Sequence, residues 1–128
     1  QSMDAINQLI RVNLSGAFYI AKASLEPLRA GRGMLLNFSS SSYSRGRAQY
    51  TPYSASKAAI VNLTQGLADE WADSGVRVNC LVPGRTDTAM RRSNFAQEAE
   101  QTLLNPFQVA LSACKLLSSD LTGMVVRV

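Results

Sequence analysis

The chain has 128 residues, of which 46% are hydrophobic and 17% charged, and its formal net charge is +4. This composition is typical of a globular protein and excludes an intrinsically disordered chain. The positive charge is modest and few aromatic residues accompany it, so the composition does not favour nucleic-acid binding.

No apolar run approaches the roughly 18 residues of a membrane span, and the first residues lack the basic and apolar segments of a signal peptide. Cys80 and Cys114 have no metal-ligand spacing, and the chain contains no histidine. We therefore expect both cysteines to be small buried apolar groups, with no metal site, in a protein of the reducing cytoplasm.

Hydrophobic patterning predicts helices that alternate with short, nearly continuous apolar strands. In chain order the predicted elements are a helix over 4–28, a strand over 33–38, a helix over 52–71, a strand over 77–82, a helix over 106–117 and a strand over 123–128. This order, αβαβαβ, predicts an α/β fold with a parallel sheet covered by helices on both faces.

Local signals support the first and last of these helices. The first helix has an apolar stripe formed by Val12, Phe18, Ala21 and Leu25. The segment 31–33 ends that helix with glycines, which tolerate a left-handed backbone. Asn105 places a capping side chain before Pro106 at the start of the last helix.

Three residues with a characteristic spacing indicate a catalytic site. Tyr53 and Lys57 lie four apart on the predicted helix over 52–71, so their side chains project from the same face. A phenol is a weak acid at neutral pH, and a nearby ammonium favours its ionised form. Ser40 follows the strand over 33–38, where a neutral donor can polarise a carbonyl group. Because the chain has no histidine, a general acid must be Tyr, Lys, a carboxylate or Cys.

Four segments extend this pattern over nearly the whole chain. They are the helix segment 12–18, the strand end Asn37-Phe38-Ser39-Ser40, the helix segment Tyr53-Ser54-Ala55-Ser56-Lys57, and the strand and turn over 76–84 followed by Thr88. In this order they resemble the short-chain dehydrogenase/reductase family. The resemblance implies the C-terminal half of a Rossmann-like doubly wound parallel sheet. It also implies an NAD(P)-dependent oxidoreductase that reduces a carbonyl to an alcohol.

The resemblance implies a role for each catalytic residue. Tyr53 would exchange a proton with the substrate oxygen, Ser40 would hold that oxygen, and Lys57 would favour the phenolate and bind the nicotinamide ribose. Asn13 would help to hold a water that relays protons to Lys57. The implied cofactor contacts are those of Tyr53, Lys57, Pro83, Gly84, Thr86 and Thr88. The alternative is that these side chains are ordinary structural residues of a helix face and a strand end.

The glycine-rich loop that binds the dinucleotide pyrophosphate in this family has no counterpart here, because the eight glycines are scattered. We expect residues 1–128 to be a partial domain that lacks the N-terminal half, either a fragment or the visible part of a longer protein. The strand over 33–38 would then be a hydrophobic edge. Residues 1–3 are consistent with a protease-site scar or with the native start of the helix. NADP and NAD both stay open, with NADP favoured.

Three arginines in the segment over 85–92 point to the substrate. This segment lies over the nicotinamide and the substrate in the family, and it contains Arg85, Arg91 and Arg92. Guanidinium groups match the geometry of phosphate, so we expect these residues, together with Ser40, to bind a phosphorylated substrate or the phosphates of the cofactor. The alternative is that they are solvated loop charges.

A closer resemblance covers the chain from Arg85 to its end at Val128. This part is similar to one branch of the family, the reductase domain of bifunctional cytidylyltransferase/ribulose 5-phosphate reductase enzymes. It implies ribulose 5-phosphate as the substrate, NADPH as the reductant and a fused cytidylyltransferase in the parent protein. Arg85 and Thr86 stand where an apolar pair is usual in the family, which argues against generic alcohol or steroid substrates.

Two other functions remain open. One alternative is a non-catalytic assembly fragment that serves only to form an oligomer. Domains of this family often dimerise through the helix that carries the Tyr. We expect a homo-oligomer through the helix that carries Tyr53, but assembly alone does not require the Ser, Tyr and Lys set. The chain belongs to a reductase of a nonphosphorylated carbonyl compound if the arginines do not contact the substrate.

Overall fold

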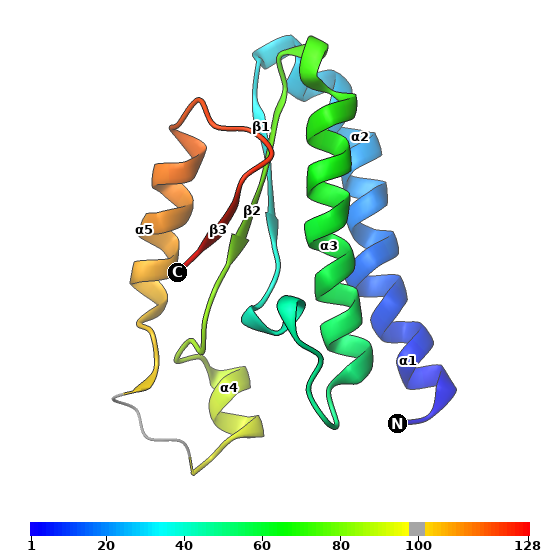
Figure 1. The fold of residues 1–128 in the computed structure, drawn as a ribbon, viewed down its shortest axis with the longest axis vertical. Coiled ribbons are helices and arrows are strands. Elements are labelled where there is room, and N and C mark those ends of the chain that lie inside the picture. Colours follow the sequence, from blue (N-terminus) through cyan, green and yellow to red (C-terminus); the bar gives the residue numbers. More distant parts are fainter. Residues whose placement is uncertain (98–101) are drawn as a thin grey trace.

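Three parallel strands form a sheet that carries helices on both faces (Figure 1). The computed structural model describes residues 1–97 and 102–128. The strands are β1 (Met34–Phe38), β2 (Arg77–Val82) and β3 (Val125–Arg127), in the order β1-β2-β3. The helices are α1 (Met3–Ile10), α2 (Gly16–Gly31), α3 (Thr51–Glu70), α4 (Ala89–Asn94) and α5 (Pro106–Leu117). The predicted α/β class and parallel sheet are confirmed.

The central strand β2 holds the sheet together. It pairs along its length with β1, starting at Met34 opposite Arg77. The short strand β3 pairs only with the carboxyl-terminal half of β2, beginning at Val125 opposite Cys80. In the part of the chain that the structure describes, β1 pairs with β2 alone and is therefore the edge strand that the sequence predicts.

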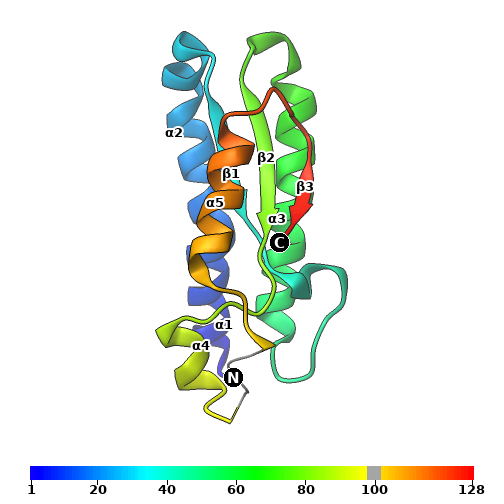
Figure 2. The same cartoon turned by 90° about the vertical axis from the view of Figure 1, so that its left-hand side faces the viewer.

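The helices form a layer on each side of the sheet. α2 and α3 contact β1 and β2 on one side, and α5 contacts the same two strands on the other. Figure 2 shows α5 in front of the strands, with α2 and α3 behind them. Residues 1–97 and 102–128 contain no helix that combines the length and hydropathy needed to cross a membrane.

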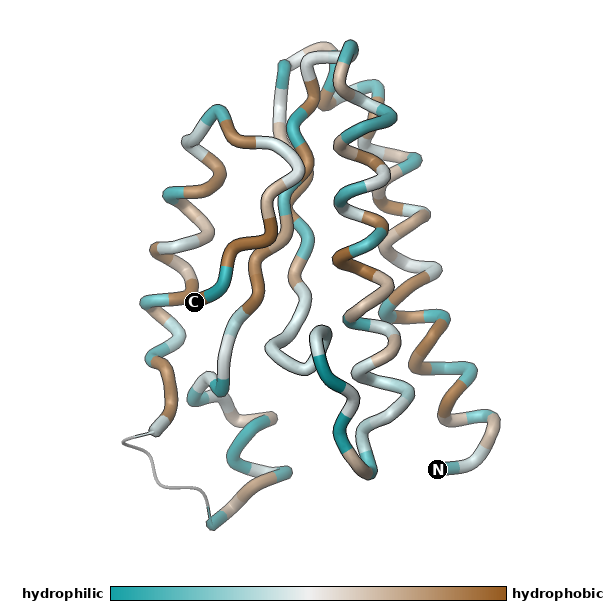
Figure 3. The backbone as a smooth tube through the Cα atoms, viewed as in Figure 1, coloured by the Kyte–Doolittle hydropathy of each residue, from teal (hydrophilic) through white to brown (hydrophobic). Residues whose placement is uncertain are grey.

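The hydrophobic core lies between β2 and α3 (Figure 3). Val78, Leu81 and Val82 of β2 are almost completely inaccessible to solvent. Leu67 and Trp71, at the end of α3, are buried in the same layer as Val78. Because both faces of β2 are covered, its sequence is a nearly continuous apolar run.

The first predicted helix is a single helical rod from Met3 to Gly31 that contains a π-helical turn at Arg11–Ser15. The rod ends at Gly31 as expected, but the left-handed residue that follows is Arg32, with φ of 49°, and not a glycine. The sequence did not indicate the π-helical turn, which holds Asn13.

Half of the predicted apolar stripe on this rod is wrong. Val12 is 63% exposed and Phe18 is 52% exposed. The residues that pack against the core are Leu14, Ala17, Ala21, Leu25 and Leu28, which recur every three or four positions. At about 100° per residue, Val12 lies on the opposite side of the rod from these residues, whereas Phe18 lies at the edge of their face and stays half exposed.

The prediction that both cysteines are buried is also wrong in part. Cys80 is fully buried in β2, but Cys114 is exposed on α5. Leu116 is the residue of α5 that is buried against the sheet. At about 100° per residue, a position two places before Leu116 lies on the opposite side of the helix.

α4 and the ends of several elements also differ from the sequence-based expectation. The sequence predicts a loop over 85–92, but this segment contains the start of α4, which Thr88 caps by accepting a hydrogen bond from the Arg91 amide. Six residues are too short to show a helical hydrophobic period. β3 is shorter than predicted, because Gly123 has a left-handed φ of 72° and forms the turn before it.

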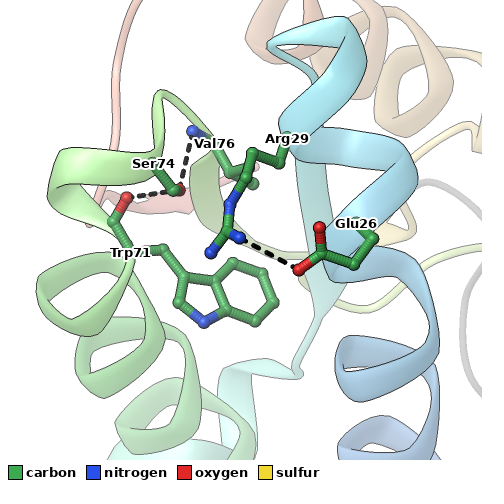
Figure 4. A network of polar contacts seen from close by, with 5 residues as sticks. All are labelled: Glu26, Arg29, Trp71, Ser74 and Val76. Carbon is green, nitrogen blue, oxygen red and sulfur yellow. Dashed lines mark hydrogen bonds and ion pairs between the residues drawn. The ribbon is translucent and has the colours of Figure 1, made fainter.

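A short turn joins α3 to β2 at the end of the sheet where the strands begin (Figure 4). The Ser74 hydroxyl donates to the Trp71 carbonyl over 2.6 Å and accepts from the Val76 amide over 3.2 Å. Arg29 and Glu26 of α2 form an ion pair of 3.0 Å beside the Trp71 ring. The Ser74 contacts thus hold the turn between α3 and β2, and the α2 ion pair lies beside it.

Asn79 connects β2 to the segment before β3, and its removal should destabilise the fold. This fully buried side chain donates to the Leu121 carbonyl over 2.6 Å and accepts from the Met124 amide over 2.9 Å. Asn79→Ala leaves both groups without these partners, so we expect the free energy of unfolding of the intact protein to fall by about 2–4 kcal/mol in urea titrations. The matched control is Asn94→Ala, exposed at the end of α4, which should change it by less than about 0.5 kcal/mol. Equal changes in the two variants would contradict this role of Asn79.

Candidate active site

An open cleft of about 340 Å³ lies at the carboxyl end of the sheet. Its lining comes from the ends of β1 and β2, the first turns of α3 and α5, and the segment that leads to α4. The lining residues are Ser39, Ser40, Tyr53, Pro83, Gly84, Thr86, Thr88, Pro106 and Val109. In open parallel sheets, ligands bind beyond the carboxyl ends of the strands, as this cleft would allow.

The ends of β1 and β2 run side by side into the cleft. Beyond the last strand residue of β1, the Ser39 amide still donates to the Leu81 carbonyl over 2.9 Å. The Ser41 amide then donates to the Pro83 carbonyl over 3.1 Å. The backbone on either side of Ser40 is thus fixed to β2, which sets the position of the Ser40 hydroxyl.

Two hydrogen bonds attach α3 to the end of β1. The Ser39 hydroxyl donates to the Lys57 carbonyl over 2.7 Å, and the Lys57 ammonium donates to the Phe38 carbonyl over 3.1 Å. The ammonium nitrogen of Lys57 lies 5.8 Å from the centre of the Tyr53 ring. The four-residue spacing therefore places the phenol and the ammonium together, as the sequence predicts.

Burial affects the protonation of the groups behind the cleft. It lowers the pKa of Lys57 below the ordinary value of 10.5, and the nearby Cys80 acts in the opposite direction. Burial also raises the pKa of the Cys80 thiol, while a hydrogen bond with Thr64 and the charge of Lys57 oppose that rise. The Lys57 ammonium is therefore less strongly favoured here than in water.

A chain of hydrogen bonds joins the first helical rod to the Tyr53 turn. The Asn13 amide group donates to the Ser56 hydroxyl over 3.1 Å, and that hydroxyl donates to the Tyr53 carbonyl over 2.7 Å. Ser56 is 1% exposed. The π-helical turn that holds Asn13 is a local widening of the helix, a feature that is frequent at functional sites.

The segment after β2 passes close to the chain terminus and then forms the floor of the cleft. A Cβ atom added at Gly84 would lie 3.2 Å from both the Val128 carbonyl oxygen and a Leu104 methyl, so a larger residue would crowd the backbone. Thr86 pairs with Leu104 as an isolated parallel bridge. These contacts fix the segment that carries Thr86 and Thr88, whose side chains bear hydroxyl groups.

Two arginines of this segment contact neighbouring side chains. Arg92 makes two hydrogen bonds of 2.6 Å to the Asp87 carboxylate, which lower the pKa of Asp87. The Arg91 guanidinium carbon lies 3.9 Å from the centre of the Phe95 ring. That ring stacks on Tyr50, just before α3, with ring centres 5.7 Å apart. α4 is thereby connected to the start of the helix that carries Tyr53.

Comparison with known proteins identifies the family. The family model for short chain dehydrogenase matches residues 1–99. The chain belongs to this family. It is 40% identical over 99% of its length to the bifunctional ribulose 5-phosphate reductase/CDP-ribitol pyrophosphorylase of Haemophilus influenzae, of which it spans 27%.

Two solved structures of the family have the same arrangement of elements. A short chain dehydrogenase from Salmonella enterica serovar Typhi is 34% identical, with a TM-score of 0.90 over 99% of this chain and 54% of that one. A gluconate 5-dehydrogenase from Burkholderia cenocepacia, in complex with NADP and tartrate, is 25% identical, with a TM-score of 0.88 over 100% of this chain and 56% of that one. The chain thus spans about half the length of these family members.

The structure brings most of the predicted site residues together. Ser40, Tyr53 and the predicted cofactor residues of the segment over 83–88 line one cleft, and Lys57 and Asn13 lie behind it. Arg85, Arg91 and Arg92 are not among the residues that line it.

Sequence reasoning missed five further residues near the cleft. They are Ser39, Ser42, Ser56, Pro106 and Val109. Ser39 and Ser56 lie inside the segments that resemble the family, and Ser42 lies two residues after one of them, but the hydrogen bonds that these serines form in the fold give no signal along the sequence.

The lowered pKa of Lys57 gives a prediction for stability. Between the folded and unfolded pKa values the unfolded chain binds more protons, so stability rises with pH in that window. Lys57→Met removes this dependence. We therefore expect the stability of the unsubstituted protein, relative to that of the variant, to rise as the pH increases toward 10.5. Urea unfolding of both intact proteins at a series of pH values measures this difference, with Lys115→Met, exposed on α5, as the charge-matched control. Parallel pH curves for the parent and Lys57→Met would contradict the prediction.

Proposed function

We propose that this chain supplies the catalytic part of an NAD(P)-dependent reductase that converts a carbonyl group into an alcohol. The observation that carries the proposal is that Ser40 and Tyr53 line one cleft while the Lys57 ammonium lies 5.8 Å from the Tyr53 ring centre. We also propose that residues 1–128 are the C-terminal half of the catalytic domain of the family. The length of the relatives beyond the matched region supports this.

The donors at the cleft suit a nicotinamide cofactor. An ammonium has three donor hydrogens, and the Phe38 carbonyl accepts one of those of Lys57. Lys57 and Tyr53 would hold the nicotinamide ribose, and Pro83, Gly84, Thr86 and Thr88 would contact the nicotinamide end. The bound cofactor supplies the hydride for the reduction. The NADP complex of the Burkholderia relative supports NADP over NAD.

The side chains of the cleft would handle the proton. The Tyr53 hydroxyl would give its proton to the substrate oxygen as the carbonyl carbon is reduced. The Ser40 hydroxyl would donate a hydrogen bond to the same oxygen and hold it in place. Lys57 would stabilise the phenolate that Tyr53 leaves behind, and Asn13 would orient the water through which that proton is replaced.

A sugar phosphate is the substrate class that we favour. The Haemophilus relative is by name a ribulose 5-phosphate reductase. Arg85 stands between Gly84 and Thr86, which both line the cleft, so it is the arginine best placed for a substrate phosphate. Arg92 and Arg91 are positioned nearby by Asp87 and Phe95 and would add positive charge around that phosphate.

We further propose a cytoplasmic homo-oligomer that assembles through the layer formed by α3 and the first helical rod. Phe18, Tyr19 and Ile20 of α2 expose large apolar side chains there, which supports an interface. We propose a fused cytidylyltransferase in the parent protein, since the Haemophilus relative carries a second activity by name.

The first test of the proposed function is an assay of the intact protein with NADPH and ribulose 5-phosphate. Tyr53→Phe removes the proton donor but keeps the ring that packs in α3. We expect kcat to fall by about 10²–10⁴-fold, with an unchanged unfolding temperature, because a positioned general acid contributes that much. The intact mass of the same sample, compared with 13.8 kDa for these residues, defines the protein that was tested. Turnover close to that of the parent would contradict the role of Tyr53.

A second variant tests the substrate class. Arg85→Gln should raise KM for ribulose 5-phosphate by about 10-fold or more, because a hydrogen bond to a charged group contributes about 1.5–3 kcal/mol. It should leave the much weaker turnover of ribulose itself unchanged, since that substrate lacks the phosphate. Arg29→Gln, at the far end of α2, is the control for loss of a positive charge. An equal effect on both substrates would show that Arg85 does not bind the phosphate.

A further inference from the structure

Ser42 is a buried serine whose side chain contacts the predicted catalytic serine. It is 5% exposed and lies in the 3₁₀ turn Ser41–Ser44 that follows β1. Its hydroxyl donates to the Ser40 hydroxyl oxygen over 3.1 Å, and its backbone amide donates to the same oxygen over 3.3 Å. Two hydrogen bonds from one residue therefore reach the Ser40 oxygen.

These two bonds determine what Ser40 can do. A hydroxyl group has two acceptor positions and one donor hydrogen. Because Ser42 occupies the acceptor positions of Ser40, the remaining hydrogen of Ser40 is available to another acceptor. Accepting hydrogen bonds also polarises a hydroxyl and makes it a better donor. The Ser40 side chain lines the cleft beside Tyr53, where a substrate oxygen would lie.

We propose that Ser42 is a positioning residue that makes Ser40 a hydrogen-bond donor to the substrate oxygen. The proposal rests on the proposed reductase function and adds a residue to its machinery. Ser42 touches no reacting atom and acts only through Ser40. Without its hydroxyl, the Ser40 hydrogen would rotate between alternative acceptors, and fewer molecules would present it to the substrate.

The turn that carries Ser42 is held firmly enough for this role. The Tyr43 amide donates to the Ser40 carbonyl over 2.9 Å, which closes the turn. The Tyr43 hydroxyl accepts from Arg127 of β3 over 3.1 Å, and the Arg127 guanidinium also lies over the Tyr43 ring. The turn is thus attached to β1 at one end and to β3 at the other, and the contact between Ser42 and Ser40 does not depend on a loop that can move away.

A double-mutant cycle on the intact protein tests the proposal, with NADPH and ribulose 5-phosphate as the probes. We expect Ser42→Ala to lower kcat by about 5–10-fold with little change in KM for NADPH, as loss of one hydrogen bond of about 1 kcal/mol implies. In a Ser40→Ala background, Ser42→Ala should have no further effect, because Ser42 acts through the missing hydroxyl. Ser44→Ala, exposed in the same turn, is the matched control and should leave kcat unchanged.

Other outcomes would overturn the proposal. Effects of Ser42→Ala and Ser40→Ala that multiply would mean that Ser42 acts through packing. Unchanged kcat in Ser42→Ala, with a large loss in Ser40→Ala, would reject the role of Ser42 but keep the proposed function. Failure of Ser40→Ala to affect turnover would reject both. If Ser42→Ala does not fold in thermal unfolding, Ser42→Cys carries the same cycle, since a thiol fills the space but is a weak donor.

Discussion

Two hydrogen bonds between the end of β1 and Lys57 fix the position of α3 on the sheet. The Ser39 hydroxyl holds the Lys57 carbonyl, and the Lys57 ammonium returns to the Phe38 carbonyl. Because Tyr53 lies one turn before Lys57, this junction also places the phenol at the edge of the cleft. A shift of α3 along the sheet would separate Tyr53 from Ser40 and leave no site for a substrate oxygen.

Buried polar side chains hold the scaffold around this junction. Asn37 of β1 donates to the Thr64 hydroxyl of α3 over 3.0 Å, and Asn79 of β2 anchors the segment before β3. Such groups have a high free-energy cost unless their partners are in place, so they favour one arrangement of the strands and helices over its alternatives. The position of Ser40 depends on that arrangement, because its neighbours are bonded to β2.

The proposed site has two parts, the cleft with the groups suited to the chemistry and, beside it, the arginines proposed for recognition. Ser40, Tyr53 and Lys57 come from β1 and α3, which are packed against the core. Arg85 comes from the segment that leads into α4, and Arg91 and Arg92 come from α4 itself, which is followed by Phe95. The Phe95 ring stacks on Tyr50 and lies against Arg91. This division agrees with the general placement of specificity on loops that a rigid scaffold positions. It is also consistent with the different substrates that the names of the related proteins indicate.

The sequence by itself determined the α/β class, the order of the main elements and the pairing of Tyr53 with Lys57, because each depends on spacing along one segment. Tertiary structure decided the π-helical turn at Asn13, the exposure of Cys114, and the contacts of Ser42. The first two depend on packing between segments far apart in the chain, which no local pattern encodes, and the contacts of Ser42 depend on the tight turn that follows β1. The sequence shows that residue 42 carries a hydroxyl group, but only the turn Ser41–Ser44 brings that hydroxyl to the Ser40 oxygen.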